Sequence, residues 1–279
     1  MRRLISYAGT TIALSWVGED AAGIATFLFS GFPAPAPGGG SPAAQYHCGP
    51  GCAPGKLALV RDGVMLWEGE DQGAAAETWL AAVSYDLANH SRNGLLFHAA
   101  ALRAPCGGVI LPAAAGSGKS TLALRLALSG FAWRTDELVF VREMTLEAMP
   151  ALRPLSLKRA AADAVRGIVD LAADPGRVLE CPGGWFLSPS LLAPDADPGP
   201  LPWNLMIFPR WKAGAAFSLA RLTKAQAGLE LMQCCVNARN LAEHGFPTAT
   251  RLAAAAPAYR LRYGAFEQLA PLDDLLSGR

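Results

Sequence analysis

The first third of the chain contains short runs in which hydrophobic and polar residues alternate, the pattern of strands with one buried face. Residues 56–61 and 64–68 alternate on either side of an Asp-Gly pair, which favours a hairpin turn. Residues 12–16 also have strand character, and residues 74–89 predict a helix. We therefore expect residues 1–90 to form a small α+β region.

The larger part of the chain, residues 91–279, is predicted to form the core domain. It opens with two apolar strands at 94–102 and 108–112, joined by a short turn. Antiparallel pairing about this turn would set His98 across from Ala113. The further predicted elements are a helix at 120–128, strands at 131–135 and 138–141, a helix at 158–171, a strand at 203–210 and a helix at 223–243.

Two segments are rich in Pro and Gly. Residues 32–55 also contain many Ala residues, and we expect a long surface loop or a disordered insertion there. Residues 193–202 form the second such tract. Both segments are candidate contact surfaces for a partner.

Composition narrows the classes of partner. Charged residues make up 17% of the 279 residues and the formal net charge is +1, so no basic field attracts nucleic acid or an anionic membrane. The apolar stretch at 21–32 is too short to span a bilayer, and the first residues lead into no clear signal-peptide core. We expect a cytoplasmic protein that binds neither nucleic acid nor membrane.

The chain has six cysteines, of which Cys48 and Cys52 lie close to His47. A metal site at these three residues is one interpretation. No second closely spaced Cys or His pair completes a zinc site, so reduced thiols in a Gly/Pro loop are the favoured interpretation.

Residues 111–121, of sequence LPAAAGSGKST, have the pattern of a phosphate-binding P-loop between an apolar strand and a helix. Glycines let backbone N–H groups turn around phosphate oxygens, Lys119 supplies a cation, and the Ser120 hydroxyl suits Mg²⁺. Ala113 stands where the pattern usually has its first Gly, which is acceptable if its φ is negative. The predicted nucleotide-binding residues are Ala115, Gly116, Ser117, Gly118, Lys119, Ser120 and Thr121.

Four further residues are candidates for phosphoryl-transfer chemistry. Asp136 ends the strand that follows the P-loop helix, where α/β sheets gather ligand groups, although a solvated turn would also explain it. His98 is either a core residue or a catalytic one. Lys158 and Arg210 follow apolar runs. Two interpretations hold for each: the side chain contacts phosphate, or it extends its charged end to solvent.

The order of these blocks resembles the catalytic domain of HPr kinase/phosphorylase and its relatives, most closely the HPr kinase-related kinase A group. The resemblance rests on residues 96–98, 108–111, 116–120 and 136–137. The blocks at 155–158 and 207–210 are also similar, so it covers residues 91–263.

The resemblance implies the α/β fold shared with phosphoenolpyruvate carboxykinases, a P-loop on a mixed sheet with flanking helices. It implies that Lys119 holds the β- and γ-phosphates, that Ser120 and Glu137 hold Mg²⁺, and that Asp136 is the base toward an acceptor hydroxyl with His98 beside it. The glycine-rich signature linked to dephosphorylation is not evident, and residues 1–90 do not look like the amino-terminal domain of the bifunctional enzyme. Neither phosphorolysis, HPr as substrate nor the hexamer is carried over.

The leading hypothesis is a kinase that uses ATP and Mg²⁺ to phosphorylate a hydroxyl, of Ser or Thr, on a small protein or peptide. One alternative is a regulatory or scaffold protein that binds ATP without transferring phosphate. Another is a small-molecule kinase. The sequence leaves the oligomeric state open, and a homo-oligomer is compatible with it.

Overall fold

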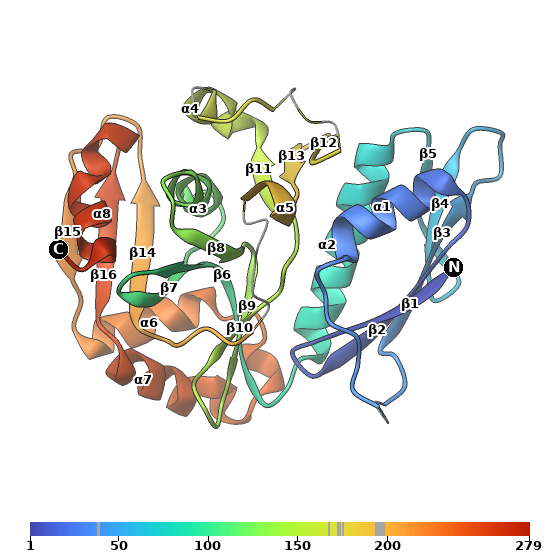
Figure 1. Cartoon of the computed structure of the whole chain (residues 1–279). Coiled ribbons are helices and arrows are strands. Elements are labelled where there is room, and N and C mark those ends of the chain that lie inside the picture. Colours follow the sequence, from blue (N-terminus) through green and yellow to red (C-terminus); the bar gives the residue numbers. More distant parts are fainter. Residues whose placement is uncertain (38–39, 167, 172–173, 175, 193–198) are drawn as a thin grey trace.

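The computed structural model describes the whole chain except residues 38–39, 167, 172–173, 175 and 193–198. Over the described residues, the chain is a mixed α/β protein with three sheets and helices that cover them (Figure 1). The predicted boundary at 90/91 falls between the end of α2 (Gln72–His90) and the start of β6 (Gly94–Ala104). Within the Pro-rich tract at 193–202, residues 193–198 lie outside the described part.

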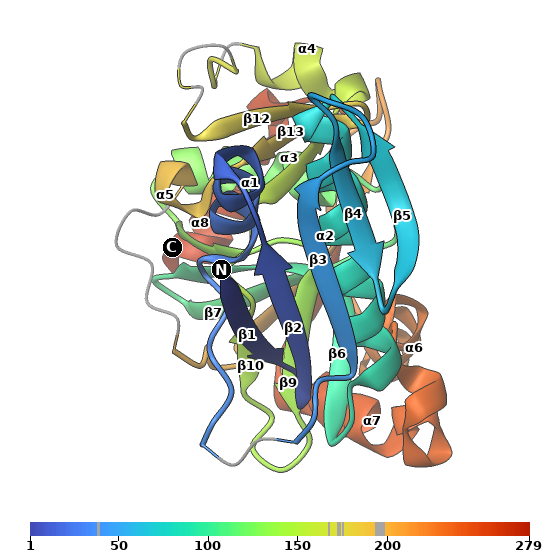
Figure 2. The same cartoon turned by 90° about the vertical axis from the view of Figure 1, so that its right-hand side faces the viewer.

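Residues before this boundary form a five-stranded sheet in the order β1-β2-β3-β4-β5, packed on two helices. Figure 2 shows the five strands side by side with α2 behind them. Side chains from the sheet and the helices, including Ile12, Leu14 and Trp79, share one fully buried cluster. The elements are β1 (Arg2–Tyr7), β2 (Thr10–Trp16), α1 (Glu19–Phe29), β3 (Ala44–Pro50), β4 (Leu57–Arg61), β5 (Val64–Gly69) and α2.

The prediction that residues 32–55 form a loop or insertion throughout was wrong. Their second half contains β3, the central strand of the first sheet. Tyr46 and Cys48 are buried whereas Gln45 and His47 are exposed, which is the alternation of a strand with one face in the core. The Gly- and Pro-rich composition on either side concealed this short alternating run.

The second sheet has eight strands over the described residues, in the order β10-β9-β6-β7-β14-β16-β15, with β8 also paired to β6. β14 is parallel to both β7 and β16, and the other pairs are antiparallel. Three parallel strands therefore end at the same edge. The strands after β6 are β7 (Gly107–Pro112), β8 (Ala132–Thr135), β9 (Leu138–Arg142), β10 (Ala148–Pro150), β14 (Leu205–Trp211), β15 (Ser218–Arg221) and β16 (Ala258–Tyr263).

Helices cover both faces of this sheet (Figure 1). One face packs against α3 (Lys119–Leu128) and α8 (Ala270–Ser277), and the other packs against α6 (Lys224–Cys234) and α7 (Phe246–Ala255). A small third sheet, with α4 and α5, closes over α3. It consists of β11 (Leu155–Lys158), β12 (Val178–Cys181) and β13 (Gly184–Leu187), and the helices are α4 (Ala162–Val165) and α5 (Pro189–Leu192).

Two predicted helices are shorter than expected. The range 158–171 begins with the end of β11 at Lys158 and passes through a 3₁₀ turn, and among its described residues only α4 is α-helical. The helix expected at 223–243 ends with α6 at Cys234. There the chain turns to pair with β6: the Asn237 side chain accepts from Leu96 N (2.8 Å) and donates to Gly94 O (3.0 Å). These backbone partners on the strand compete with helix continuation.

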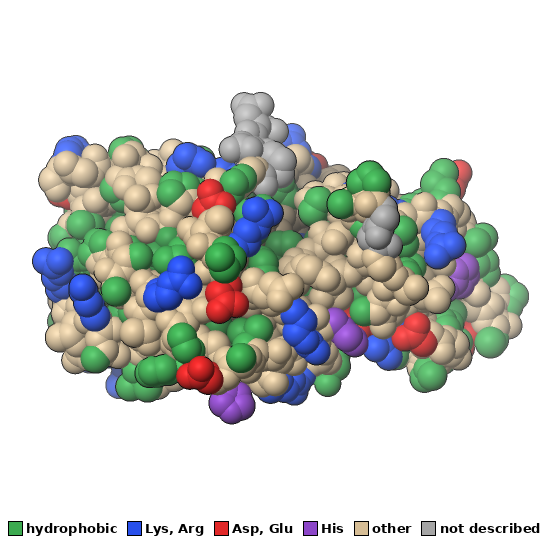
Figure 3. Space-filling model, turned by 90° about the horizontal axis from the view of Figure 1, so that it is seen from below, with side chains coloured by type: hydrophobic (Ala, Val, Ile, Leu, Met, Phe, Trp, Pro, Cys, Tyr) green, Lys and Arg blue, Asp and Glu red, His purple; other side chains and the backbone are tan. Residues whose placement is uncertain are grey.

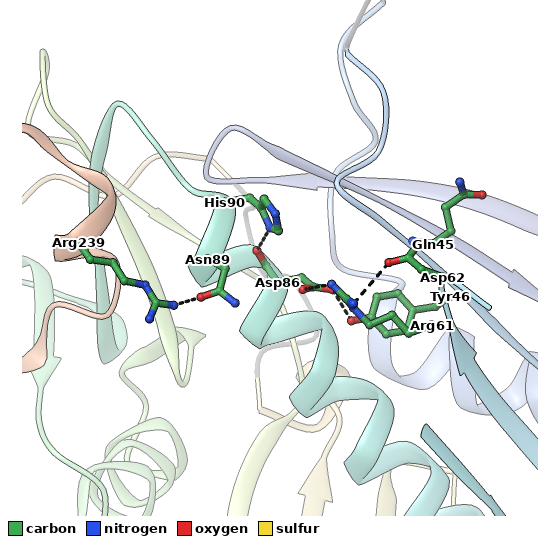
Figure 4. A network of polar contacts seen from close by, with 8 residues as sticks. All are labelled: Gln45, Tyr46, Arg61, Asp62, Asp86, Asn89, His90 and Arg239. Carbon is green, nitrogen blue, oxygen red and sulfur yellow. Dashed lines mark hydrogen bonds and ion pairs between the residues drawn. The ribbon is translucent and has the colours of Figure 1, made fainter. Parts of the chain in front are cut away.

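A polar network fastens α2 to the first sheet and to the second region (Figure 4). Buried Asp86 accepts from Arg61 Nε and Nη2 at 2.8 Å each and from Tyr46 Oη at 2.6 Å. Three residues further along α2, Asn89 accepts from Arg239 of the second region. Burial raises the pKa of Asp86, but the hydrogen bonds from Arg61 and Tyr46 lower it more, so the carboxyl titrates below its ordinary range.

On the face shown in Figure 3, Lys and Arg side chains are interspersed with Asp and Glu. Among the described residues, we find no helix with the length and apolar character needed to cross a membrane.

We predict that Asp86→Asn lowers the free energy of unfolding by about 2 kcal/mol, because Arg61 and Tyr46 lose their charged acceptor. Asp62→Asn is the matched control. Asp62 also contacts Arg61, at 3.5 Å, but on the surface, so its loss should cost less than about 0.5 kcal/mol. Urea denaturation of both variants measures the difference, and equal costs would contradict a special role of the buried network.

The same carboxylate gives a pH dependence. A carboxyl with a lowered folded-state pKa contributes fully above its unfolded pKa of about 4, and the contribution is lost as the pH falls through the folded value. The stability difference between the wild type and Asp86→Asn should therefore shrink below about pH 4. A difference that stays constant from pH 6 to pH 3 would contradict this.

Candidate active site

The predicted P-loop lies between β7, which ends at Pro112, and α3, which begins at Lys119. Gly116 has φ 82° and Gly118 has φ 86°, in the left-handed region that favours glycine. Ala113 does not have a positive φ, so alanine is acceptable where the pattern usually has glycine. Its N–H donates to His98 O at 3.1 Å, which confirms the predicted pairing across the β6–β7 hairpin.

Strands β14 and β16 hold this loop from the side. Trp211 N donates to Ser117 O at 2.9 Å, and Tyr263 Oη donates to Gly118 O at 3.4 Å. A Cβ at Gly118 would lie 2.7 Å from the Cβ of Trp211, so a larger residue would displace the loop. Two loop carbonyls are thus engaged by the strands, while the positive end of α3 adjoins the same loop.

Asp136 lies against the start of α3. Its side chain is completely buried, and Lys119 Nζ contacts its Oδ1 in an ion pair that is also nearly inaccessible to water. Ser120 Oγ donates to Oδ2 at 2.7 Å. Asp136 therefore faces the base of the loop rather than the open space above it.

Glu137 turns the other way. Its φ of 78° is unusual for a residue with a side chain, and this conformation separates the directions of the two adjacent carboxylates. Glu137 Oε2 lies 2.6 Å from His98 Nε2. Burial raises the pKa of Glu137, but Lys119, His98 and Arg153 together lower it far more, so the group is a carboxylate at neutral pH.

A pocket of about 470 Å³ opens above the loop. Its wall includes the loop from Ala114 to Thr121, His98, Glu137 and Lys158, but not Asp136 or Arg210. Lys158 therefore lies where it can contact a bound phosphate. Arg210 instead forms an ion pair with Glu230 of α6, at 2.6 Å, and the adjacent Trp211 lines the pocket.

Arg153 is a residue near the site that the sequence analysis missed. Only 5% of it is exposed, and its Nη1 donates to Ser84 Oγ of α2 at 3.1 Å. Burial lowers its pKa, opposed by the charges of Glu137, Asp136 and Tyr7, and the net shift is downward. A single Arg between apolar residues and just before a Pro was the available signal. Arg153 belongs to the second region, and Ser84 of the first region accepts a hydrogen bond from it beside the acidic pair.

The structure does not bring His47, Cys48 and Cys52 together. His47 is exposed, with its Nδ1 3.0 Å from Ser15 Oγ, whereas Cys48 is fully buried on the opposite face of β3. Burial raises the pKa of the Cys48 thiol to about 11. No group of three or more His, Cys, Asp or Glu side chains suited to a metal ion occurs in the described part of the chain.

We predict that Lys119 and Asp136 are energetically coupled. Lys119→Met and Asp136→Asn should each lower the unfolding free energy by about 3 kcal/mol, since each leaves a buried charge without its partner. The double variant should cost clearly less than the sum of the single changes. Glu180→Gln, at an exposed ion pair with Arg159 (3.0 Å), should cost less than about 0.5 kcal/mol. Additive costs for the buried pair would contradict the coupling.

No protein-family model matches the chain, and no curated protein matches it either. Among solved structures, the HPr(Ser) kinase/phosphatase from Coxiella burnetii is similar over 66% of this chain and 94% of that chain. The sequence identity is 13% and the TM-score is 0.32. A TM-score of this size does not establish a common fold or activity, and the function proposed below depends on the geometry of the site.

Proposed function

We propose that the protein is a kinase that uses ATP and Mg²⁺ to phosphorylate a hydroxyl group. The observation that carries the proposal is that the adjacent acids Asp136 and Glu137 face different parts of the site. Asp136 contacts Lys119 and Ser120 at the loop, while Glu137 and His98 line the pocket above it. Phosphoryl transfer needs both kinds of group, one set at the phosphates and one at the acceptor, because positioning and charge stabilisation supply most of the rate.

The loop from Ala115 to Thr121 would bind the triphosphate. Gly118 leaves no room for a side chain, and the start of α3 contributes unpaired N–H groups and its dipole. Lys119 would move its charge from Asp136 toward the β- and γ-phosphates. Lys158, which also lines the pocket, would be the second cation for this purpose.

Ser120 and Asp136 fit a magnesium site. Both offer oxygen atoms, which Mg²⁺ prefers, and they already lie 2.7 Å apart at the foot of the loop. Bound there, Mg²⁺ would neutralise charge on the phosphate oxygens. The sequence analysis assigned this role to Glu137 and the role of base to Asp136. The contacts of the two carboxylates favour the reverse assignment.

Glu137 would then face the acceptor hydroxyl. It is ionised at neutral pH and is hydrogen-bonded to His98, which fixes its orientation. A carboxylate with a lowered pKa is a weak base, so Glu137 would orient the hydroxyl and take its proton late in the transfer. The resemblance of the sequence blocks to HPr kinases favours a Ser or Thr hydroxyl on a small protein or peptide.

Phosphate transfer from γ-labelled ATP with Mg²⁺ into a lysate of the source cells tests the proposal. We expect a labelled acceptor with the wild type and none with Lys119→Ala, which should also lose ATP binding. Glu137→Gln should keep ATP binding but transfer phosphate at least about 100-fold more slowly. Glu180→Gln is the control for handling and folding, because Glu180 is exposed and does not line the pocket.

Two other results would change the conclusion. ATP binding that Lys119→Ala abolishes, with no labelled acceptor, would support a nucleotide-sensing protein. Full transfer by Glu137→Gln, combined with loss of transfer but not of folding in Asp136→Asn, would restore Asp136 as the base.

A further inference from the structure

The pocket wall combines the phosphate cradle with apolar and small residues. These are Trp211, Phe266, Gly264, Ala265, Ala160, Ala161 and Ala164. A triphosphate alone has no use for such a surface. Apolar pockets with a few polar groups bind the aromatic part of a ligand.

We propose that Trp211 is the stacking surface for the nucleobase of the phosphate donor, so that the site selects a nucleoside triphosphate over an inorganic one. The inference rests on the proposed function and adds to it the group that recognises the donor.

Trp211 is the last residue of β14, which runs parallel to the P-loop strand β7. Its backbone N–H bonds to Ser117 O and its Cβ lies against Gly118. The indole therefore starts directly beside the phosphate cradle. Yet 46% of the residue is exposed, unlike the fully buried Trp79 and Trp133. An exposed indole in a pocket offers a face for a planar ligand.

The neighbouring segment after β16 is braced in place. Gly264 N donates to the Gln268 side chain at 2.9 Å, and the same side chain donates to Ala215 O at 3.2 Å. Phe266 lies between these anchored residues and also lines the pocket. The backbone segment that carries the second aromatic ring is thus held by hydrogen bonds of the Gln268 side chain.

Charges of both signs occur in the pocket wall. Lys119 and Lys158 are cations, and Glu137, Asp163 and Glu267 bring carboxylates, of which Glu267 is next to Phe266. Carboxylates repel phosphate but accept hydrogen bonds from the amino groups of a base. Glu267 therefore offers a hydrogen-bond acceptor for such an amino group next to the second aromatic residue of the pocket.

Binding of two Mg²⁺-loaded ligands, ATP and inorganic triphosphate, tests the inference by calorimetry. The wild type should bind ATP at least about tenfold more tightly than triphosphate, given the size of base–aromatic stacking. Trp211→Ala should lose this margin while its affinity for triphosphate stays within about twofold, and Trp211→Phe should keep most of it. Alanine retains the Cβ and the N–H that hold the loop. Trp67→Phe, in β5 of the first region, is the matched control and should behave as the wild type.

Three results would overturn the inference. The first is that Trp211→Ala binds ATP as tightly as the wild type does. The second is that Trp211→Ala loses affinity for ATP and for triphosphate to the same extent. The third is that the wild type binds triphosphate as tightly as ATP. In all three cases the wild type still binds a phosphate ligand, so these results do not contradict phosphate binding by the loop. A wild type that binds neither ligand would instead refute the proposed function itself.

Discussion

The buried ion pair between Lys119 and Asp136 connects the parts of the site. Lys119 is the first residue of α3, and Asp136 directly follows β8, the strand after that helix, so one contact connects the loop, the helix and the strand. Removing both charges from water is costly, and the attraction offsets this only with good geometry and further hydrogen bonds. Ser120 supplies one of these bonds. The same contact keeps a cation next to the loop in the absence of a ligand.

A single backbone conformation then determines how two adjacent acids are used. Because Glu137 adopts a positive φ, Asp136 faces the base of the loop and Glu137 faces the pocket. The first acid is shielded and paired, and the second is accessible and next to His98. A strained turn of this kind persists only where its surroundings impose it, and here Ala99 N donates to Glu137 O at 3.2 Å.

Much of this arrangement could be predicted from local patterns. Alternation and the Asp-Gly turn predicted the β4–β5 hairpin, and the pairing of His98 with Ala113 followed from antiparallel pairing about the turn between their strands. Contacts between distant parts of the chain could not be predicted in this way. Arg153 is held by its hydrogen bond to Ser84, and the end of α6 is determined by Asn237 bonding to β6. The backbone angle of Glu137, on which the two acid positions depend, has no signature in residue type.

The bonds from Trp211 and Tyr263 to the loop have a consequence for affinity. A glycine-rich loop has many conformations in the unfolded chain, and restricting them costs conformational entropy. Because β14 and β16 hold the Ser117 and Gly118 carbonyls in the folded protein, that cost falls on folding rather than on binding. A ligand therefore meets a preorganised loop, and less of its interaction energy is consumed in ordering the protein.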